Sequence, residues 1–157
     1  MAKRKHTKRN ILIGLLILLI AIQFIRPARN NGPISTPNDI THYVTVPDTV
    51  MHVLQRSCYD CHSNHTVYPW YTNINPVGLW LNNHINEGKR AIDFSDLSSF
   101  DARKLDHRID DIAKEVKSGD MPLSSYTLIP TYAKLDTNEV KLITEWTKQA
   151  RLELQKR

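Results

Sequence analysis

Residues 58–62 read Cys58-Tyr59-Asp60-Cys61-His62, a C-x-x-C-H motif that contains both cysteines of the chain. Positions three apart on a helix share one face, so both thiols can reach the same ligand while the following imidazole turns towards it. C-x-x-C-H is the attachment motif of covalently bound haem. We therefore predict one haem c per chain, bonded to Cys58 and Cys61, with His62 as the proximal ligand of the iron.

Three other interpretations of the two cysteines are open. A disulfide between them would suit an exported protein. A thioredoxin-like redox pair would need a βαβ context, which the sequence lacks. A zinc site could combine the two thiolates with His62 and His65, although structural zinc usually takes its ligands from two separated pairs. Neither the disulfide nor the redox pair requires His62.

A haem iron can take a second axial ligand, and in electron carriers this is usually a methionine. Met121 lies in Gly119-Asp120-Met121-Pro122, where a glycine stop and a proline shape an irregular loop after a predicted helix. We predict Met121 as the distal ligand; the alternative role for this side chain is to fill the core. His84, on the apolar face of a different predicted helix, is the alternative distal ligand.

Helical periodicity recurs in four stretches after residue 47, and no stretch alternates as a strand would. The expected helices cover about residues 48–61, 75–88, 105–119 and 136–150. Asn75 and Pro76 open the second and Gly88 stops it, Gly119 stops the third, and a capping box of Asp136 with Glu139 opens the fourth. The predicted fold class is all-α, a small cytochrome c-like helical domain around its haem.

Aromatic side chains gather just after the motif, in Tyr68-Pro69-Trp70-Tyr71. A flat porphyrin needs apolar walls that exclude water, and these rings are candidates for that role or for ordinary core. A backbone carbonyl of Pro69 or Pro76 is the expected acceptor for the second N–H of His62.

The N-terminal residues differ from the rest of the 157-residue chain. Residues 1–10 are strongly basic, and residues 11–25 are apolar except for Gln23, as in a signal peptide or signal anchor. No small-x-small cleavage site follows, so we expect a retained anchor. Fifteen residues reach about 22 Å of a bilayer core of about 30 Å, and Arg26 with Lys8 or Arg9 would snorkel to close the gap.

The charge pattern sets the expected orientation. Six of the 21 Lys and Arg residues lie in residues 1–26, which contain no acid, so the rest of the chain carries 15 basic and 16 acidic residues. The basic end stays in the cytoplasm, which predicts a single-pass protein of the cytoplasmic membrane with its haem domain on the periplasmic side. No basic stripe with interleaved aromatics is present, so no nucleic-acid partner is expected. The predicted divisions are 1–26 (anchor), 27–47 (a Pro/Asn-rich tether) and 48–157 (haem domain).

Several motifs together resemble one family over roughly residues 42–150. They are Ser57-Cys58-Tyr59-Asp60-Cys61-His62-Ser63-Asn64, Thr66, Pro69-Trp70-Tyr71, Pro76, His84, Gly88, and Met121-Pro122-Leu123 with Tyr126. The sequence resembles the bacterial haem-binding domain family, which is related to class I cytochromes c. The resemblance implies an exported helical domain with haem c on Cys58 and Cys61, proximal His62 and, by analogy with cytochromes c at large, distal Met121. One position departs from the pattern, because Pro130 stands where we associate a histidine with the family.

These predictions favour an electron carrier over a catalyst. Such a protein would exchange electrons with redox partner proteins at the membrane. The alternatives are a haem enzyme or sensor whose open distal site takes peroxide or a gas, and a protein in which haem or zinc has a structural role.

Overall fold

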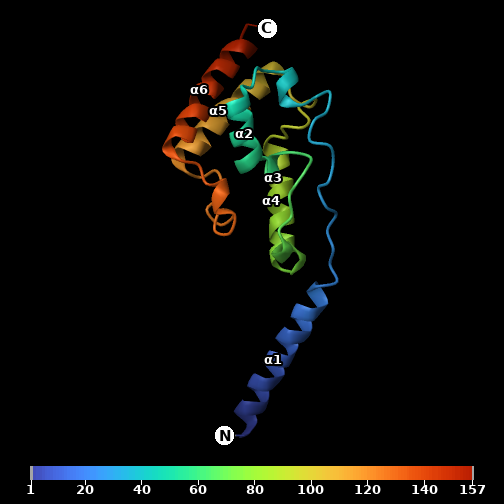
Figure 1. Cartoon of the computed structure of the whole chain (residues 1–157). Coiled ribbons are helices and arrows are strands. Elements are labelled where there is room, and N and C mark those ends of the chain that lie inside the picture. Colours follow the sequence, from blue (N-terminus) through green and yellow to red (C-terminus); the bar gives the residue numbers. More distant parts are fainter. Residues whose placement is uncertain (1, 157) are drawn as a thin grey trace. The chain divides into compact units, whose positions relative to one another are not determined.

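The computed structural model describes the backbone of residues 2–156 and the side chains of residues 6–156. The described residues form helices and no strand (Figure 1). The α-helices are α1 (Ala2–Ile22), α2 (Asp48–Ser57), α3 (Tyr59–His62), α4 (Val77–Ala91), α5 (Ala102–Ser118) and α6 (Thr137–Leu154); short 3₁₀ helices are η1 (Ile40–His42), η2 (Trp70–Asn73) and η3 (Thr131–Ala133). The predicted all-α class is confirmed.

The chain divides into two compact units, which are described separately. The smaller unit combines the residues up to Arg29 with Tyr68–His84. The larger unit combines Asn30–Val67 with the residues from Ile85 on. It therefore contains the C-x-x-C-H motif and Met121.

The core of the larger unit is built on α5 and α6, which lie side by side (Figure 1). Arg151 of α6 binds Asp106 of α5 with an N–O distance of 3.0 Å and also pairs with Asp110. Apolar side chains from α2 and from the segments before α2 and after α4 complete this core. Its fully buried members include Ile40, Val44, Val50, Leu54, Leu97, Leu105, Ile109, Ile143 and Ala150.

The end of α5 and the start of α6 match the sequence-based predictions. Gly119 follows α5 with φ of 80°, a left-handed conformation that glycine adopts without steric cost. At α6, Asp136 accepts a hydrogen bond from the N–H of Glu139, and the Glu139 carboxylate accepts one from the N–H of Asp136. The predicted glycine stop and capping box are confirmed.

The predicted helix over residues 48–61 divides at Cys58. Helix α2 ends at Ser57 and α3 begins at Tyr59, because Cys58 adopts φ of −123° and leaves the helical range. The N–H of Cys58 still donates to the carbonyl of Leu54 at 2.8 Å, and its own carbonyl accepts from the N–H of His62 at 3.0 Å. Cys58 therefore lies at a break between two helical segments, and Cys61 lies in the second.

Helix α4 continues through Gly88, which the sequence predicts as its stop. The carbonyl of Gly88 accepts a normal backbone hydrogen bond from Ile92 at 2.9 Å. A β-carbon at residue 88 would lie 2.6 Å from the carbonyl oxygen of Cys61. The glycine is therefore explained by the close approach of the α3 backbone to α4.

Much of the stretch predicted as a tether, residues 27–47, packs into the larger unit. The N–H of Gly32 donates to the carbonyl of Asn64 at 2.7 Å, and the N–H of Thr66 donates to the carbonyl of Asn30 at 2.9 Å. Ile40 and Val44 are buried in the core. The contacts involve scattered residues without periodicity, which is why sequence pattern alone did not indicate them.

The smaller unit contains α1, whose apolar side chains from Ile11 to Ile20 are exposed. Asn75, predicted to cap the helix that follows it, instead donates its side-chain amide to the carbonyls of Ile22 and Ile25, just after α1. Gln23 exchanges hydrogen bonds with the backbone of Asn75 at 2.9 and 3.0 Å. Among the described residues, no helix combines the length and the apolar character that crossing a membrane requires.

Candidate functional site

The C-x-x-C-H motif borders a cavity of about 410 Å³ in the larger unit. Cofactor and ligand cavities typically measure about 300–1,000 Å³ and have mainly apolar walls. The lining comes from the junction of α2 and α3, the segment after α4, one side of α5 and the loop that follows it. The lining residues are Ser57, Cys58, His62, Ala91, Ile92, Phe94, Arg108, Asp111, Ile112, Glu115, Val116, Met121 and Pro122.

The imidazole of His62 is oriented by the backbone of the segment after α4. Its Nδ1 lies 3.1 Å from the carbonyl oxygen of Ile92, and the N–H of Phe94 donates to the carbonyl of His62 at 2.7 Å. A carbonyl can only accept, so Nδ1 carries the proton and Nε2 keeps its lone pair. The expected acceptor was a carbonyl of Pro69 or Pro76; the structure assigns this role to Ile92. A hydrogen bond of this kind, from the ring nitrogen that does not bind the metal to a backbone carbonyl, orients a metal-binding histidine.

Burial keeps the three motif side chains neutral. It lowers the pKa of His62 below its usual value, against smaller raising effects from the backbone carbonyls of Ile92 and Gly88. It raises the pKa of Cys58 and of Cys61 to about 12. A neutral imidazole is the form that ligates a metal ion.

The alternative interpretations of the cysteines find no support in the structure. Cys58 and Cys61 are not bonded to each other. Within the part of the chain that the structure describes, no three His, Cys, Asp or Glu side chains gather into a metal site. The βαβ context of a thioredoxin-like pair is also missing from the described residues.

Met121 lines the same cavity as Cys58 and His62. Helix α5 ends at Ser118, and the N–H groups of Asp120 and Met121 both donate to the carbonyl of Glu115, at 3.0 and 3.1 Å. The left-handed Gly119 makes this tight reversal possible, so the end of α5 determines where the thioether emerges. The structure thus brings together three of the predicted site residues.

His84, the alternative distal ligand, is not one of the residues that line this cavity. It belongs to the smaller unit, where its ring packs edge-on against Trp80 with the ring centres 4.4 Å apart. The sequence places His84 on the apolar face of its helix, where it is expected to pack against neighbouring side chains. In the structure that neighbour is the ring of Trp80.

Tyr68, Trp70 and Tyr71, which the sequence offers as porphyrin wall or as ordinary core, belong to the smaller unit and are not among the lining residues. Phe94 lines the cavity instead, with only 2% of its surface exposed. Its ring centre lies 6.0 Å from that of His62, and it stacks on Tyr59 at 5.4 Å. The sequence signal was weak, since Ala91-Ile92-Asp93-Phe94 is too short to show a period.

A hydrogen bond links the middle of the motif to the segment after Met121. The Tyr126 hydroxyl donates to Oδ2 of Asp60 at 2.5 Å, and Oδ1 of Asp60 accepts from the N–H of Val67 at 2.9 Å. Burial and the Asp60 carboxylate both raise the pKa of Tyr126, so this phenol stays protonated. Asp60 therefore joins three stretches of chain around the two cysteines.

The donor set and the walls fit a haem. A partly buried imidazole with Nε2 available, a thioether and a motif thiol line one mainly apolar cavity of suitable size. In the family comparison, residues 17–149 match the model described as a haem-binding domain. No curated protein matches the chain, and no solved structure does. The match spans most of the sequence and includes the motif, the cavity and Met121, and on these grounds the chain belongs to the haem-binding domain family.

Proposed function

We propose that this protein carries electrons through a single haem c, bonded to Cys58 and Cys61 and ligated by His62 and Met121. The observation that carries the proposal is the shared cavity, which places the motif thiol of Cys58, the imidazole of His62 and the thioether of Met121 on one set of walls. A thioether and an imidazole would together hold the iron as in His/Met electron carriers, where the soft sulfur favours the reduced state and raises the potential.

When bound, the haem supplies an iron that exchanges one electron between its ferrous and ferric states. The chain's own residues provide orientation and exclusion of water. Ile92 and Phe94 are buried on the cavity wall, and the Ile92 carbonyl holds the imidazole of His62 in one orientation. His62 and Met121 both line this cavity, so they would hold an iron there with little rearrangement of the chain, which suits an electron carrier better than a catalyst.

The distal ligand is tested by visible spectroscopy of the full chain, expressed in a host that attaches haem c. We expect a low-spin spectrum with a thioether-to-iron charge-transfer band in the wild type. Met121→Leu removes the sulfur at similar volume and should abolish that band. Met51→Leu is the matched control, because Met51 lies in α2 and does not line the cavity.

The other outcomes separate the alternatives. A high-spin wild-type spectrum indicates an open site, as in an enzyme or gas sensor. A low-spin spectrum unchanged by Met121→Leu but altered by His84→Gln makes His84 the ligand. Absence of covalently attached haem, measured by mass spectrometry of the purified chain, rejects the haem c proposal itself.

We propose further that the apolar stretch at residues 11–25 holds the protein at the cytoplasmic membrane, with the haem domain exported and redox partner proteins nearby. The support is the basic stretch before it and the exposed apolar side chains of α1 from Ile11 to Ile20. Leu16→Asp with Ile17→Asp should release the chain into the soluble fraction, whereas alanine at both positions should not. Retention of the aspartate variant in alkali-washed membranes contradicts the proposal.

A further inference from the structure

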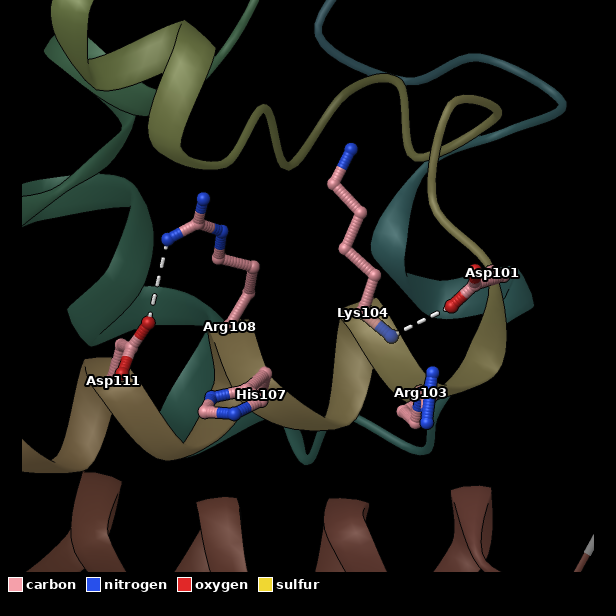
Figure 2. Close-up of a pocket in the computed structure, with 6 residues that line it drawn as sticks. All are labelled: Asp101, Arg103, Lys104, His107, Arg108 and Asp111. Carbon is pink, nitrogen blue, oxygen red and sulfur yellow. Dashed lines mark hydrogen bonds and ion pairs between the residues drawn. The ribbon is translucent and has the colours of Figure 1, made fainter.

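Arg108 stands at the edge of the haem cavity and also lines a second, more polar depression on the outside of α5. Among the described residues that line the haem cavity, it is the only cation, and Asp111 and Glu115 line the same wall. Figure 2 shows Lys104 and Arg108 extending from the same edge of α5, with Arg108 turned towards Asp111.

A haem bound here would bring two propionate carboxylates, and each would need water or a cation to solvate its charge. Among the described residues that line this cavity, Asp111 and Glu115 would repel these carboxylates, and Arg108 is the only cation that would attract them. A guanidinium also matches carboxylate geometry, because its planar N–H groups can bind both oxygens.

The partner that Arg108 has in the structure is a weak competitor. Its Nη1 lies 3.4 Å from Oδ2 of Asp111, and the two side chains are 40% and 37% exposed. Half-exposed ion pairs with one long contact contribute little free energy, so Arg108 can exchange this partner at small cost. Lys104, one helical turn earlier, lies over the ring of Phe100 with its Nζ 4.5 Å from the ring centre and does not line the haem cavity.

We infer that Arg108 is the binding residue for a haem propionate and exchanges Asp111 for that carboxylate when the haem is in place. This inference rests on the proposed haem c site. Asp111 and Glu115 then remain as the acids beside the propionate, with His107 and Lys104 as the other titratable groups on this part of α5.

The test uses infrared difference spectra, reduced minus oxidised, of the full haem-loaded chain. The host is fed δ-aminolevulinate with heavy carbon in its carboxyl group, which labels the propionate carboxyls of the haem and separates their bands from those of Asp and Glu. We expect Arg108→Gln to shift the labelled carboxylate bands and to lower the midpoint potential, since a positive charge near the iron is lost. Arg108→Lys should restore the potential in part.

Lys104→Gln is the matched control, because it removes the same charge from the same edge of α5 and should leave the labelled bands unchanged. Wild-type labelled bands that persist in Arg108→Gln, with haem attachment and the axial-ligand spectrum intact, overturn this inference alone. If the wild type carries no covalent haem, the proposed function fails first, so the two failures are distinguishable.

Discussion

At the residue scale, the C-x-x-C-H motif depends on contacts that lie outside it. The side chain of His62 is oriented by the carbonyl of Ile92, and the backbone of Cys61 approaches Gly88 too closely for any side chain there. Both partners come from α4 or the segment directly after it. The position of the motif is therefore controlled by α4 as much as by its own sequence.

Gly88→Ala tests this close approach. Alanine favours a helix by about 1 kcal/mol over glycine, but the added β-carbon would lie 2.6 Å from a backbone oxygen that has no freedom to rotate away. Overpacking of this kind costs about 1–3 kcal/mol, so we expect net destabilisation in urea unfolding. Asn86→Ala, at an exposed position of the same helix, is the control and should be neutral or slightly stabilising. An increase in stability for Gly88→Ala would show that α3 and α4 are not in contact here.

At the element scale, α5 and α6 form the frame on which the cavity wall rests. One side of α5 lines the cavity, and α6 supports α5 through the Arg151 pairs. The ends of both helices are set by local sequence signals, so this frame is specified largely by short-range interactions.

The Arg151 pairs predict a dependence of stability on pH. The hydrogen bond from Arg151 holds the pKa of Asp106 below its usual value, so the pair stabilises the fold above about pH 4, where the unfolded carboxyl is also ionised. This contribution is lost as the pH falls through the folded-state pKa. Asp106→Asn should lower the free energy of unfolding by about 0.5–1 kcal/mol at neutral pH and by less in acid, as measured by urea unfolding. In the Arg151→Gln background, the same substitution should have little effect at either pH; an equal loss there means the pair contributes nothing.

The capping box gives an independent prediction for α6. Asp136 accepts hydrogen bonds from the N–H groups of Asn138 and Glu139, at 2.8 and 2.9 Å. Asp136→Ala removes both and should cost about 1 kcal/mol in urea unfolding. Thr137→Ala, at the next and exposed position, should change stability by only a few tenths of that amount. If both variants lose the same free energy of unfolding, the capping box does not contribute to the stability of α6.

At the scale of the whole molecule, the larger unit has a cavity of about 410 Å³ beside its core. Protein interiors are normally close-packed, and a haem bound here would bring its own atoms into contact with these apolar walls. We therefore expect the cofactor to add dispersion contacts that stabilise this unit.

Removal of the cofactor should thus weaken the fold. The Cys58→Ser, Cys61→Ser double variant prevents covalent attachment, and we expect its urea midpoint to fall well below that of the haem-loaded wild type. Far-ultraviolet circular dichroism of both proteins checks that the helices still form before denaturant is added. Matching midpoints would mean that the cofactor adds nothing to packing.

Local signals in the sequence were sufficient for much of this picture. C-x-x-C-H indicated haem, apolar periodicity indicated an all-helical chain, and Gly119 and Asp136 located helix ends, because each of these depends on residues within one or two turns. The prediction that Gly88 ends its helix was wrong, because the reason for this glycine is a contact with a distant segment, Cys61. A glycine required by a neighbouring backbone has the same local pattern as one that ends a helix.

By itself, the sequence determined the family, the helical class and the candidate haem attachment residues, since these depend on motif spacing and period. Only the tertiary structure decided which distant residues meet them: Ile92 as the partner of His62, Phe94 on the cavity wall, and Arg108 at its edge. It also placed Met121 on the cavity wall. The physical reason is that such contacts form when whole helices pack together. Packing brings together residues that are far apart along the chain, and the apolar periodicity of the sequence does not record which of them meet.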